Sequence, residues 1–290
     1  MPTSLPMTTT STAAASAAVA VAARFGVTSA EPVILSDGAN VIVHLSPSPV
    51  VAKVAATTML VRPDVAAWLQ RELDVVSFLA RANAPVLAPS AEMPATTHAA
   101  DGHVMSFWRY HRPAGDALPG ESAIGSMLRD LHAVLRGYPG TLGLMTPLDD
   151  VPRFLARPGT QLGAADRIML GEVFERLMAE LDPGSCPAQP LHGDAGAGNL
   201  MAAGTGWVWH DFEDTCSGPV GWDLAASTAS QRLDRARILR AYGTAVDAAR
   251  LTVCEQLRRL HLTVWYALYA ERLPEHRQRA AELLASWRAP

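Results

Sequence analysis

Cysteine, charge and long apolar runs are all scarce in this sequence. The three cysteines (Cys186, Cys216 and Cys254) form an odd set without a CxxC spacing, which argues against a disulfide framework or a zinc cluster and favours a reducing compartment. Charged residues make up 18% of the chain and the formal net charge is −4, so general binding to nucleic acid is disfavoured. No apolar run reaches the roughly 18 residues of a membrane span. These shortages predict a soluble, cytoplasmic protein. We expect it to be a monomer or a homodimer.

The amino terminus also lacks what a secretory signal needs. No basic residues precede its alanine run, and alanine is only weakly hydrophobic. We expect a disordered tail rich in Ser, Thr and Pro at residues 1–12, then a helix from about Ala13 that is closed by Gly26 in the C′ position.

Hydrophobic residues make up 49% of the chain, which is enough for a sizeable core, and their spacing changes along the sequence. Residues 33–56 contain two β-branched runs around turn signals, and further strands are expected at 86–93 and 103–110. Helical spacing appears at 66–83 and, beyond Gly120, through most of the chain. Strands in the first third and helices in the remainder predict an α+β fold with a small sheet lobe and a larger helical lobe.

One lysine interrupts an otherwise apolar strand. Lys53 lies within VVAKVA, where burying its ammonium group is costly unless an anion is nearby. Glu72, beside the apolar stripe of the next predicted helix, could supply that anion. The alternatives are an edge-strand lysine that reaches solvent and a solvated carboxylate next to Arg71.

A carboxylate and an amide are separated by small residues in HGDAGAGN. Phosphoryl transfer to an alcohol needs a carboxylate that accepts or orients the hydroxyl proton, and an oxygen ligand nearby for Mg²⁺. Glycines and alanines let the chain bring Asp194 and Asn199 to one cavity. Asp211 ends a hydrophobic strand and follows Asp194 by 17 positions. That interval is long enough for a strand, a turn and a returning strand, which would bring the two acids together. Each of these residues could instead belong to an ordinary turn.

The order Lys, Glu, H-x-D-x-x-x-x-N and D-F-x resembles the layout of protein kinases. The variants HGDAGAGN and HDFEDTCSGPVGWDLA, together with MLRDLHAVL, are similar to the aminoglycoside phosphotransferase and choline kinase branch of that superfamily. This resemblance covers most of the chain. It implies a bilobal protein-kinase-like fold, with an N-terminal nucleotide-binding lobe at 13–106, a hinge at 107–116 and a helical lobe with catalytic loop and substrate pocket at 117–290.

The resemblance also implies a chemical role for each matched residue. Lys53 would contact the α/β phosphates of ATP, or of GTP as the alternative nucleotide, with Glu72 as its ion-pair partner. Asp194 would be the catalytic base. Asn199 and Asp211 would hold Mg²⁺.

Further positions would support that site. His192 would be a structural member of the catalytic loop, and Asp223 would brace the loop from below. Main-chain groups of Phe107, Trp108 and Arg109 would read the purine edge.

The sequence departs from the family pattern at several points. The loop expected to cover the phosphates, LSDGANVIV, has one glycine, Gly38, so Ser36 or Asn40 would donate hydrogen bonds there. His210, just before the metal-binding aspartate, is either a core histidine bound to backbone or a group near the metal. Glu213 replaces the glycine of D-F-G, so activation-loop switching is not expected.

These features predict a small-molecule O-phosphotransferase, with an antibiotic as the leading acceptor class and therefore a role in antibiotic resistance. The acceptor is expected near residues 145–165 and the helices after 230, but the arginines of that last region weaken the case for a strongly cationic drug. Candidate contacts are the acids Asp149, Asp150 and Asp214 and the tryptophans Trp207, Trp209, Trp222 and Trp265, although Trp more often packs in a core.

Three rivals stay open. The first is a metabolic kinase for choline, ethanolamine, homoserine or a sugar, and a choline site would need an aromatic cage. The second is a nucleotide-binding regulatory protein without turnover. The third is a divalent-metal hydrolase that uses His192, Asp194, His210 and Asp211.

Overall fold

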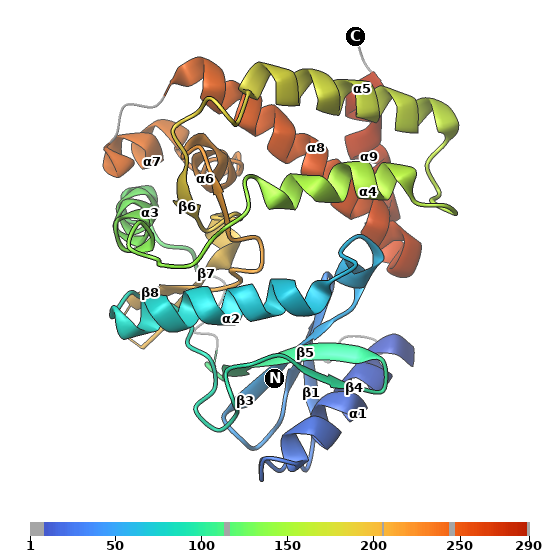
Figure 1. The fold of residues 1–290 in the computed structure, drawn as a ribbon, viewed down its shortest axis with the longest axis vertical. Coiled ribbons are helices and arrows are strands. Elements are labelled where there is room, and N and C mark those ends of the chain that lie inside the picture. Colours follow the sequence, from blue (N-terminus) through green and yellow to red (C-terminus); the bar gives the residue numbers. More distant parts are fainter. Residues whose placement is uncertain (1–8, 113–116, 205, 244–246, 289–290) are drawn as a thin grey trace. The chain divides into compact units, whose positions relative to one another are not determined.

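The computed structural model describes residues 9–112, 117–204, 206–243 and 247–288, which fall into two compact units (Figure 1). The first unit comprises Met1–Gly115 with Ala203–Trp209, and the second comprises Asp116–Ala202 with His210–Pro290. Most of the predicted tail, at 1–8, and the end of the predicted hinge, at 113–116, lie outside the described residues. Among the helices of the described ranges, none combines the length and apolarity that a bilayer crossing requires.

The first unit is built on an antiparallel sheet with the strand order β1-β2-β3-β5-β4. Its elements in chain order are α1 (Thr9–Ala23), β1 (Val33–Asp37), β2 (Asn40–His44), β3 (Val50–Ala55), the 3₁₀ turn η1 (Thr57–Leu60), α2 (Val65–Arg81), β4 (His98–Ala100), β5 (His103–Arg109) and β8 (Gly206–Trp209).

The strand predicted at 86–93 is wrong. This segment, described throughout, forms isolated bridges from Val86 to Trp209 and from Pro89 to Trp108. Proline cannot donate to a strand ladder, so Pro89 in the middle of this segment limits it to single contacts.

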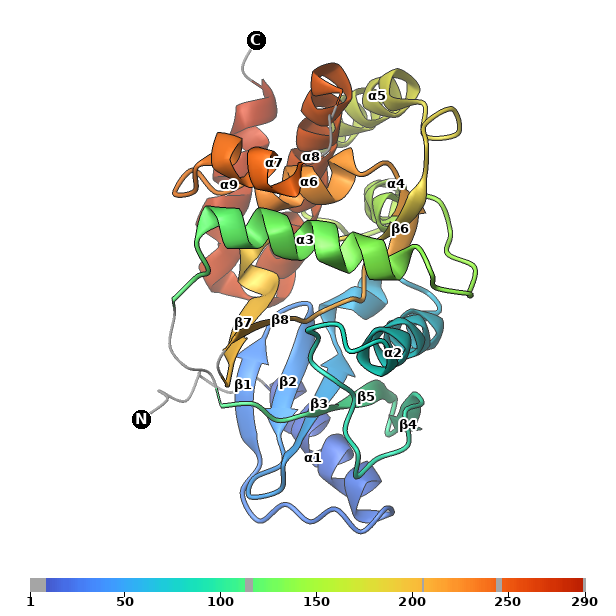
Figure 2. The ribbon, with the colours of Figure 1, turned by 90° about the vertical axis from the view of Figure 1, so that its left-hand side faces the viewer.

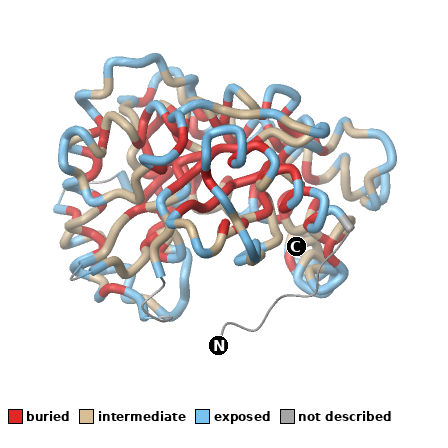
Figure 3. The backbone as a smooth tube through the Cα atoms, turned by 90° about the horizontal axis from the view of Figure 1, so that it is seen from below, coloured by how far each residue is buried: buried red, intermediate tan, exposed pale blue. Residues whose placement is uncertain are grey.

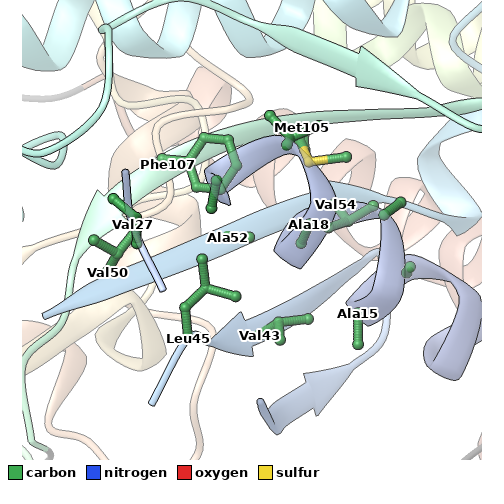
Figure 4. Close-up of a cluster of buried hydrophobic side chains, with 14 of the residues drawn as sticks. Ala15, Ala18, Val27, Val43, Leu45, Val50, Ala52, Val54, Met105 and Phe107 are labelled. Carbon is green, nitrogen blue, oxygen red and sulfur yellow. The ribbon is translucent and has the colours of Figure 1, made fainter. Parts of the chain in front are cut away.

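Helix α1 covers one face of the sheet. Ala15 and Ala18 on the helix belong to one buried cluster with Val43, Ala52 and Val54 on the strands (Figure 4). Small side chains on the helix allow its backbone to lie close to these strands.

The helix begins at Thr9, four residues before the predicted start, so residues 9–12 are helical and do not belong to a tail. Ser11 is only 1% exposed, and burial against the sheet outweighs the weak helix preference of Ser and Thr. The chain leaves the helix through a turn in which Gly26 has φ +80°, a conformation that favours glycine.

Strand β3 is buried on both faces because helices cover both sides of it. Side chains alternate along a strand, so Ala52 and Val54 face α1 while Lys53 and Ala55 face α2. Ala55 packs there against Val65 and Leu69 of α2.

The second unit is mainly helical. Its elements are α3 (Glu121–Leu135), η2 (Thr146–Asp149), α4 (Asp150–Ala156), α5 (Ala164–Leu181), β6 (Gln189–Leu191), η3 (Ala197–Asn199), β7 (Leu200–Ala203), β9 (Cys216–Gly218), α6 (Gly221–Ser227), α7 (Arg235–Tyr242), α8 (Ala248–Arg272), η4 (Pro274–His276) and α9 (Arg277–Arg288). The first unit contains the five-stranded sheet and the second unit contains most of the helices. This arrangement confirms the predicted α+β fold of the protein-kinase-like type.

Helices α3 and α7 pack side by side (Figure 2). Their backbones approach closely at Gly125, where a Cβ atom would lie 2.3 Å from the main-chain oxygen of Ile238. In both units, exposed residues concentrate on turns and outer helix faces (Figure 3).

All three cysteines lie in the second unit as buried thiols. Burial raises the pKa of the Cys254 thiol to about 12. A thiol with such a pKa is almost entirely protonated at neutral pH and therefore a poor nucleophile.

Candidate active site

Lys53 and Glu72 form a buried ion pair in the first unit. The Lys53 ammonium donates to Oε1 and Oε2 of Glu72 at 3.0 and 2.9 Å, and the two side chains are 6% and 2% exposed. Glu72 lies three residues after Leu69 on α2, on the helix face that meets β3. The predicted contact is confirmed, and the solvated alternatives for both residues are wrong.

The turn between β1 and β2 is held by hydrogen bonds to the 3₁₀ turn η1. Asn40 is 6% exposed, and its Oδ1 accepts a hydrogen bond from Thr58 Oγ1 at 3.1 Å. The main-chain oxygen of Gly38 accepts from Thr57 Oγ1 at 2.8 Å. The turn is thus tied to η1, and Ser36 lies exposed in β1. Donation of hydrogen bonds to phosphates by Ser36 or Asn40 stays a prediction.

The first residues of the predicted hinge, Phe107, Trp108 and Arg109, belong to strand β5. The main-chain oxygen of Phe107 accepts from the N–H of Ser90, and the N–H of Arg109 donates to the oxygen of Ala88, both at 3.1 Å. Trp108 is 6% exposed. The main-chain groups of Phe107 and Arg109 are thus used within the first unit, and recognition of a purine edge at residues 107–109 stays a prediction.

One buried carboxylate holds the loop at residues 192–199 in the second unit. Asp223, on α6, is fully buried; its Oδ2 accepts from the main-chain N–H of His192 at 2.8 Å and its Oδ1 from that of Gly193 at 2.9 Å. Hydrogen bonds to an ionised acceptor are short and strong. The predicted support of the loop by Asp223 is therefore present.

A histidine that the sequence did not single out completes this support. His132 Nε2, on α3, lies 2.9 Å from Asp223 Oδ2, and His132 Nδ1 lies 2.9 Å from the hydroxyl of Tyr242. Burial disfavours the ionised form of Asp223, but the hydrogen bonds and charges that His132 and His192 contribute together outweigh this effect and lower the pKa of Asp223. The sequence feature that could have identified His132 is its position in MLRDLHAVL, inside the apolar stripe that includes Leu128 and Leu135.

His192 has a structural position within the loop. Its Nε2 donates to the main-chain oxygen of His210 at 3.1 Å, and its Nδ1 accepts from the N–H of Asp194 at 3.3 Å. Desolvation lowers the pKa of His192, so the neutral ring is favoured. Because both ring nitrogens are engaged, His192 is not available as a metal ligand, which argues against the hydrolase alternative.

Asp194 and Asn199 are brought together as predicted. Asn199 Nδ2 donates to the main-chain oxygen of Asp194 at 2.7 Å and to its Oδ2 at 2.9 Å. The amide nitrogen is thus directed at Asp194, so Oδ1 is the atom with which Asn199 would bind a cation. The Asp194 side chain remains 39% exposed.

Arg258, on α8, is a second partner of Asp194 that sequence reasoning missed. It donates through Nη2 to Asp194 Oδ1 and through Nη1 to the main-chain oxygen of Gly193 at 2.8 Å. Desolvation opposes ionisation of Asp194, but the charges of Arg258 and His192 and the hydrogen bond from Arg258 together outweigh it and lower the pKa of Asp194. Asp194 is therefore ionised at neutral pH.

Asp211 lies exposed at the edge of the same site. Its negative charge acts to raise the pKa of Asp194, which shows that the two acids are near each other. Asp211 has φ +63°, a left-handed conformation that Asp tolerates better than most side chains.

The oxygen donors of this site suit a hard cation. Mg²⁺ is commonly held by one or two protein oxygens together with phosphates and water, and Asn199 and Asp211 supply such a pair. Consistent with a sparse protein ligand set, no group of three or more His, Cys, Asp or Glu residues that could hold a metal occurs within the described ranges.

The acids proposed for the acceptor pocket have different environments. Asp150 is fully buried, with His261 Nε2 3.6 Å from its Oδ2, so it cannot line an accessible pocket. Asp149 accepts a hydrogen bond from Arg153 at 3.2 Å, and Asp214 is half-buried.

Aromatic side chains converge along α8 and η4. The ring centroid of Tyr269 lies 5.6 Å from that of Trp265, 5.9 Å from that of Tyr266 and 5.3 Å from that of His276. Burial, and then the charges of Asp211 and other acids, raise the pKa of the Tyr269 hydroxyl, which places this cluster near the acidic site. Of the other tryptophans considered, Trp209 and Trp222 are core residues at 0% exposure, and Trp207 is half-buried.

Comparison with known protein families identifies the family to which this chain belongs. The model of the phosphotransferase enzyme family matches residues 36–253. The chain belongs to the phosphotransferase enzyme family. It is accordingly a phosphotransferase with a hydroxyl acceptor, which disfavours the reading as a regulatory protein without turnover.

Solved structures with the same fold include several kinases of small molecules. An amicoumacin kinase in complex with AMP-PNP, Ca²⁺ and Ami aligns with a TM-score of 0.70 and 12% identity, over 97% of this chain and 96% of that chain. An aminoglycoside-3′-phosphotransferase of type VIII aligns with a TM-score of 0.61 and 19% identity, over 84% and 98%. A choline kinase from Streptococcus pneumoniae aligns with a TM-score of 0.59 and 14% identity, over 92% and 98%. No curated protein matches.

Proposed function

We propose that this phosphotransferase is an ATP-dependent kinase of a small molecule, with an antibiotic as the leading acceptor class. The observation that carries the proposal is the loop at 192–199: an ionised, partly exposed Asp194 bound to Asn199, on a backbone whose amides are held by buried Asp223. Phosphoryl transfer depends on positioning and on charge compensation more than on covalent chemistry. A rigid carboxylate meets that requirement.

In the proposed reaction, Asp194 accepts or orients the proton of the acceptor hydroxyl. Lys53, fixed by Glu72, binds the α/β phosphates of the nucleotide. Mg²⁺, which would neutralise charge developing on the phosphates, would be held by Asn199 Oδ1 and Asp211. GTP is the alternative nucleotide.

Recognition of the purine edge by main-chain groups at residues 107–109 is part of this proposal. Since Phe107 and Arg109 use such groups within the first unit, residues 111–112, which follow β5, are the alternative. A cytoplasmic location and a role in antibiotic resistance belong to the same proposal.

A second acceptor class is favoured by the aromatic cluster of Trp265, Tyr266, Tyr269 and His276. Aromatic faces near carboxylates bind ammonium groups, so a choline-like or other amino-alcohol acceptor would fit this part of α8.

The test is a screen for transfer of one phosphate, measured by mass spectrometry. The purified protein is incubated with Mg²⁺, ATP or GTP, and a panel of aminoglycosides, amicoumacin, choline, ethanolamine, homoserine and sugars. We expect one acceptor class to gain a phosphate and Asp194→Asn to abolish the gain while sparing nucleotide affinity. Asp130→Asn, at an exposed acid on α3, is the control. An Asp194→Asn variant as active as wild type would refute the proposed base.

A further inference from the structure

The guanidinium of Arg258 is fixed on three sides within the second unit. It donates to Asp194 Oδ1 and to the main-chain oxygen of Gly193. Its Cζ lies 4.7 Å from the ring centroid of Trp222, and the indole N–H of Trp222 donates to the same Gly193 oxygen at 2.8 Å. The Arg258 side chain is 16% exposed, so little water competes for its donors.

These contacts determine the orientation of the Asp194 carboxylate. One of its oxygens accepts from Arg258 and the other accepts from Asn199 Nδ2, so the plane of the group is defined from both ends. A carboxylate has about four lone-pair positions, and the 39% of the side chain that is exposed leaves room for a further partner.

The planar fork of an arginine is needed for this geometry. Its two terminal nitrogens reach two successive residues of the loop while its face lies on an indole. An ammonium group is a compact point charge without a planar face, so a lysine could satisfy only one of these partners.

We propose that Arg258 is a positioning residue, which holds the Asp194 carboxylate in the orientation that the acceptor hydroxyl requires. This inference rests on the proposed function, because it assigns a purpose to the orientation of the proposed base. Arg258 acts through Asp194, to which it donates directly.

The kinetic test compares Arg258→Met and Arg258→Lys with wild type at saturating Mg·ATP, using an acceptor from the screen, or water as acceptor through slow ATP hydrolysis. We expect both variants to lower kcat by about 100-fold, the effect of a misplaced catalytic group, with the KM for ATP within a factor of about two. Added guanidinium ion should restore activity to Arg258→Ala but not to Asp194→Asn.

The adjacent Arg259 supplies a matched control on the same helix. It stacks on Trp287 and donates to the main-chain oxygen of Ser286, so Arg259→Ala removes comparable contacts away from the loop and should keep wild-type kcat. Wild-type activity in Arg258→Met or in Arg258→Lys would overturn the inference. A fall in kcat/KM due entirely to a higher KM for ATP would also overturn it.

A measurement without any acceptor separates this inference from the proposed function. In urea unfolding of Arg258→Met, Asp194→Asn and the double variant, we expect the two single effects to be non-additive because the side chains are in contact. Additive effects would overturn the inference. If wild type transferred phosphate to no acceptor and hydrolysed no ATP, the proposed function would fail, and this double-mutant cycle would still decide whether Arg258 fixes Asp194.

Discussion

His132 Nε2 lies 2.9 Å from Asp223 Oδ2, and neither side chain is exposed to solvent. This contact joins α3 to the carboxylate that holds the main chain of the loop at residues 192–199. Without the imidazole, the buried Asp223 charge would keep only the main-chain N–H groups of His192 and Gly193 among these partners, and removal of one member of a buried pair is strongly destabilising. The loop therefore depends on a residue 91 positions away in sequence from Asp223.

We expect His132→Leu to lower the free energy of unfolding by about 3–5 kcal/mol, because Asp223 would keep its charge in a site that water cannot reach. Urea unfolding followed by circular dichroism measures this change. Tyr242→Phe, which deletes only the hydroxyl bound to His132 Nδ1, is the matched control and should lose about 1 kcal/mol. Equal losses in the two variants would contradict a special role for the pair.

The ion pair of the first unit makes a different prediction. Lys53→Met removes the ammonium group that buried Glu72 accepts from, and Glu72→Leu removes the carboxylate from buried Lys53, so each should lose about 3–5 kcal/mol of unfolding free energy. The double variant should be more stable than either single variant, because two apolar groups replace the pair. Thermal unfolding of the three proteins tests this order, while the KM for ATP should rise in all three.

Gly193 is required by its conformation and by its neighbour. It has φ +88°, and a Cβ atom there would lie 1.7 Å from the main-chain oxygen of Asp214. Gly193→Ala should therefore displace the loop, with a loss of stability above the 1–3 kcal/mol or so typical of backbone strain alone. Gly198, in the same loop, has open space at the corresponding position, and Gly198→Ala should unfold close to wild type.

The lowered pKa of His192 predicts a pH dependence of stability. The folded protein keeps this ring neutral, whereas the unfolded chain takes up a proton near pH 6.5. Its contribution is therefore fully present above about pH 6.5 and declines as the pH falls below that value. Unfolding free energies between pH 7.5 and 5.5 should fall more steeply for wild type than for His192→Gln; parallel curves would show that His192 is not the group responsible.

Contacts between residues close in the sequence could be predicted from local sequence patterns. Contacts between residues far apart in the sequence were missed, because they depend on how the chain folds. Lys53 and Glu72 could be paired because a charge inside an apolar strand demands a partner on the helix that follows. Asp194 and Asn199 lie within one short loop, so their contact follows from small intervening residues. Arg258 is 64 positions from Asp194, and its arginine-rich helix gave no sign of which arginine turns inward.

The errors in the first unit have a similar cause. The sequence identified the turn around Gly38 but could not show that Asn40 faces inward to Thr58. It predicted a strand at 103–110 and a hinge from Phe107, and these two predictions overlap at residues 107–109, which lie in β5. Strand ends and side-chain direction depend on tertiary partners, here the segment around Ala88.

The three buried thiols make it possible to measure local unfolding of the second, helical unit separately from that of the first, sheet unit. Cys186, Cys216 and Cys254 all lie in the helical unit, and the sequence of the sheet unit contains no cysteine. A thiol-reactive dye in excess would then be consumed at the rate at which the helical unit exposes its interior. Opening of the sheet unit alone would leave the dye unreacted. A single dye reaction with the wild-type protein, without an engineered label, can therefore show whether the helical unit opens when the protein is heated.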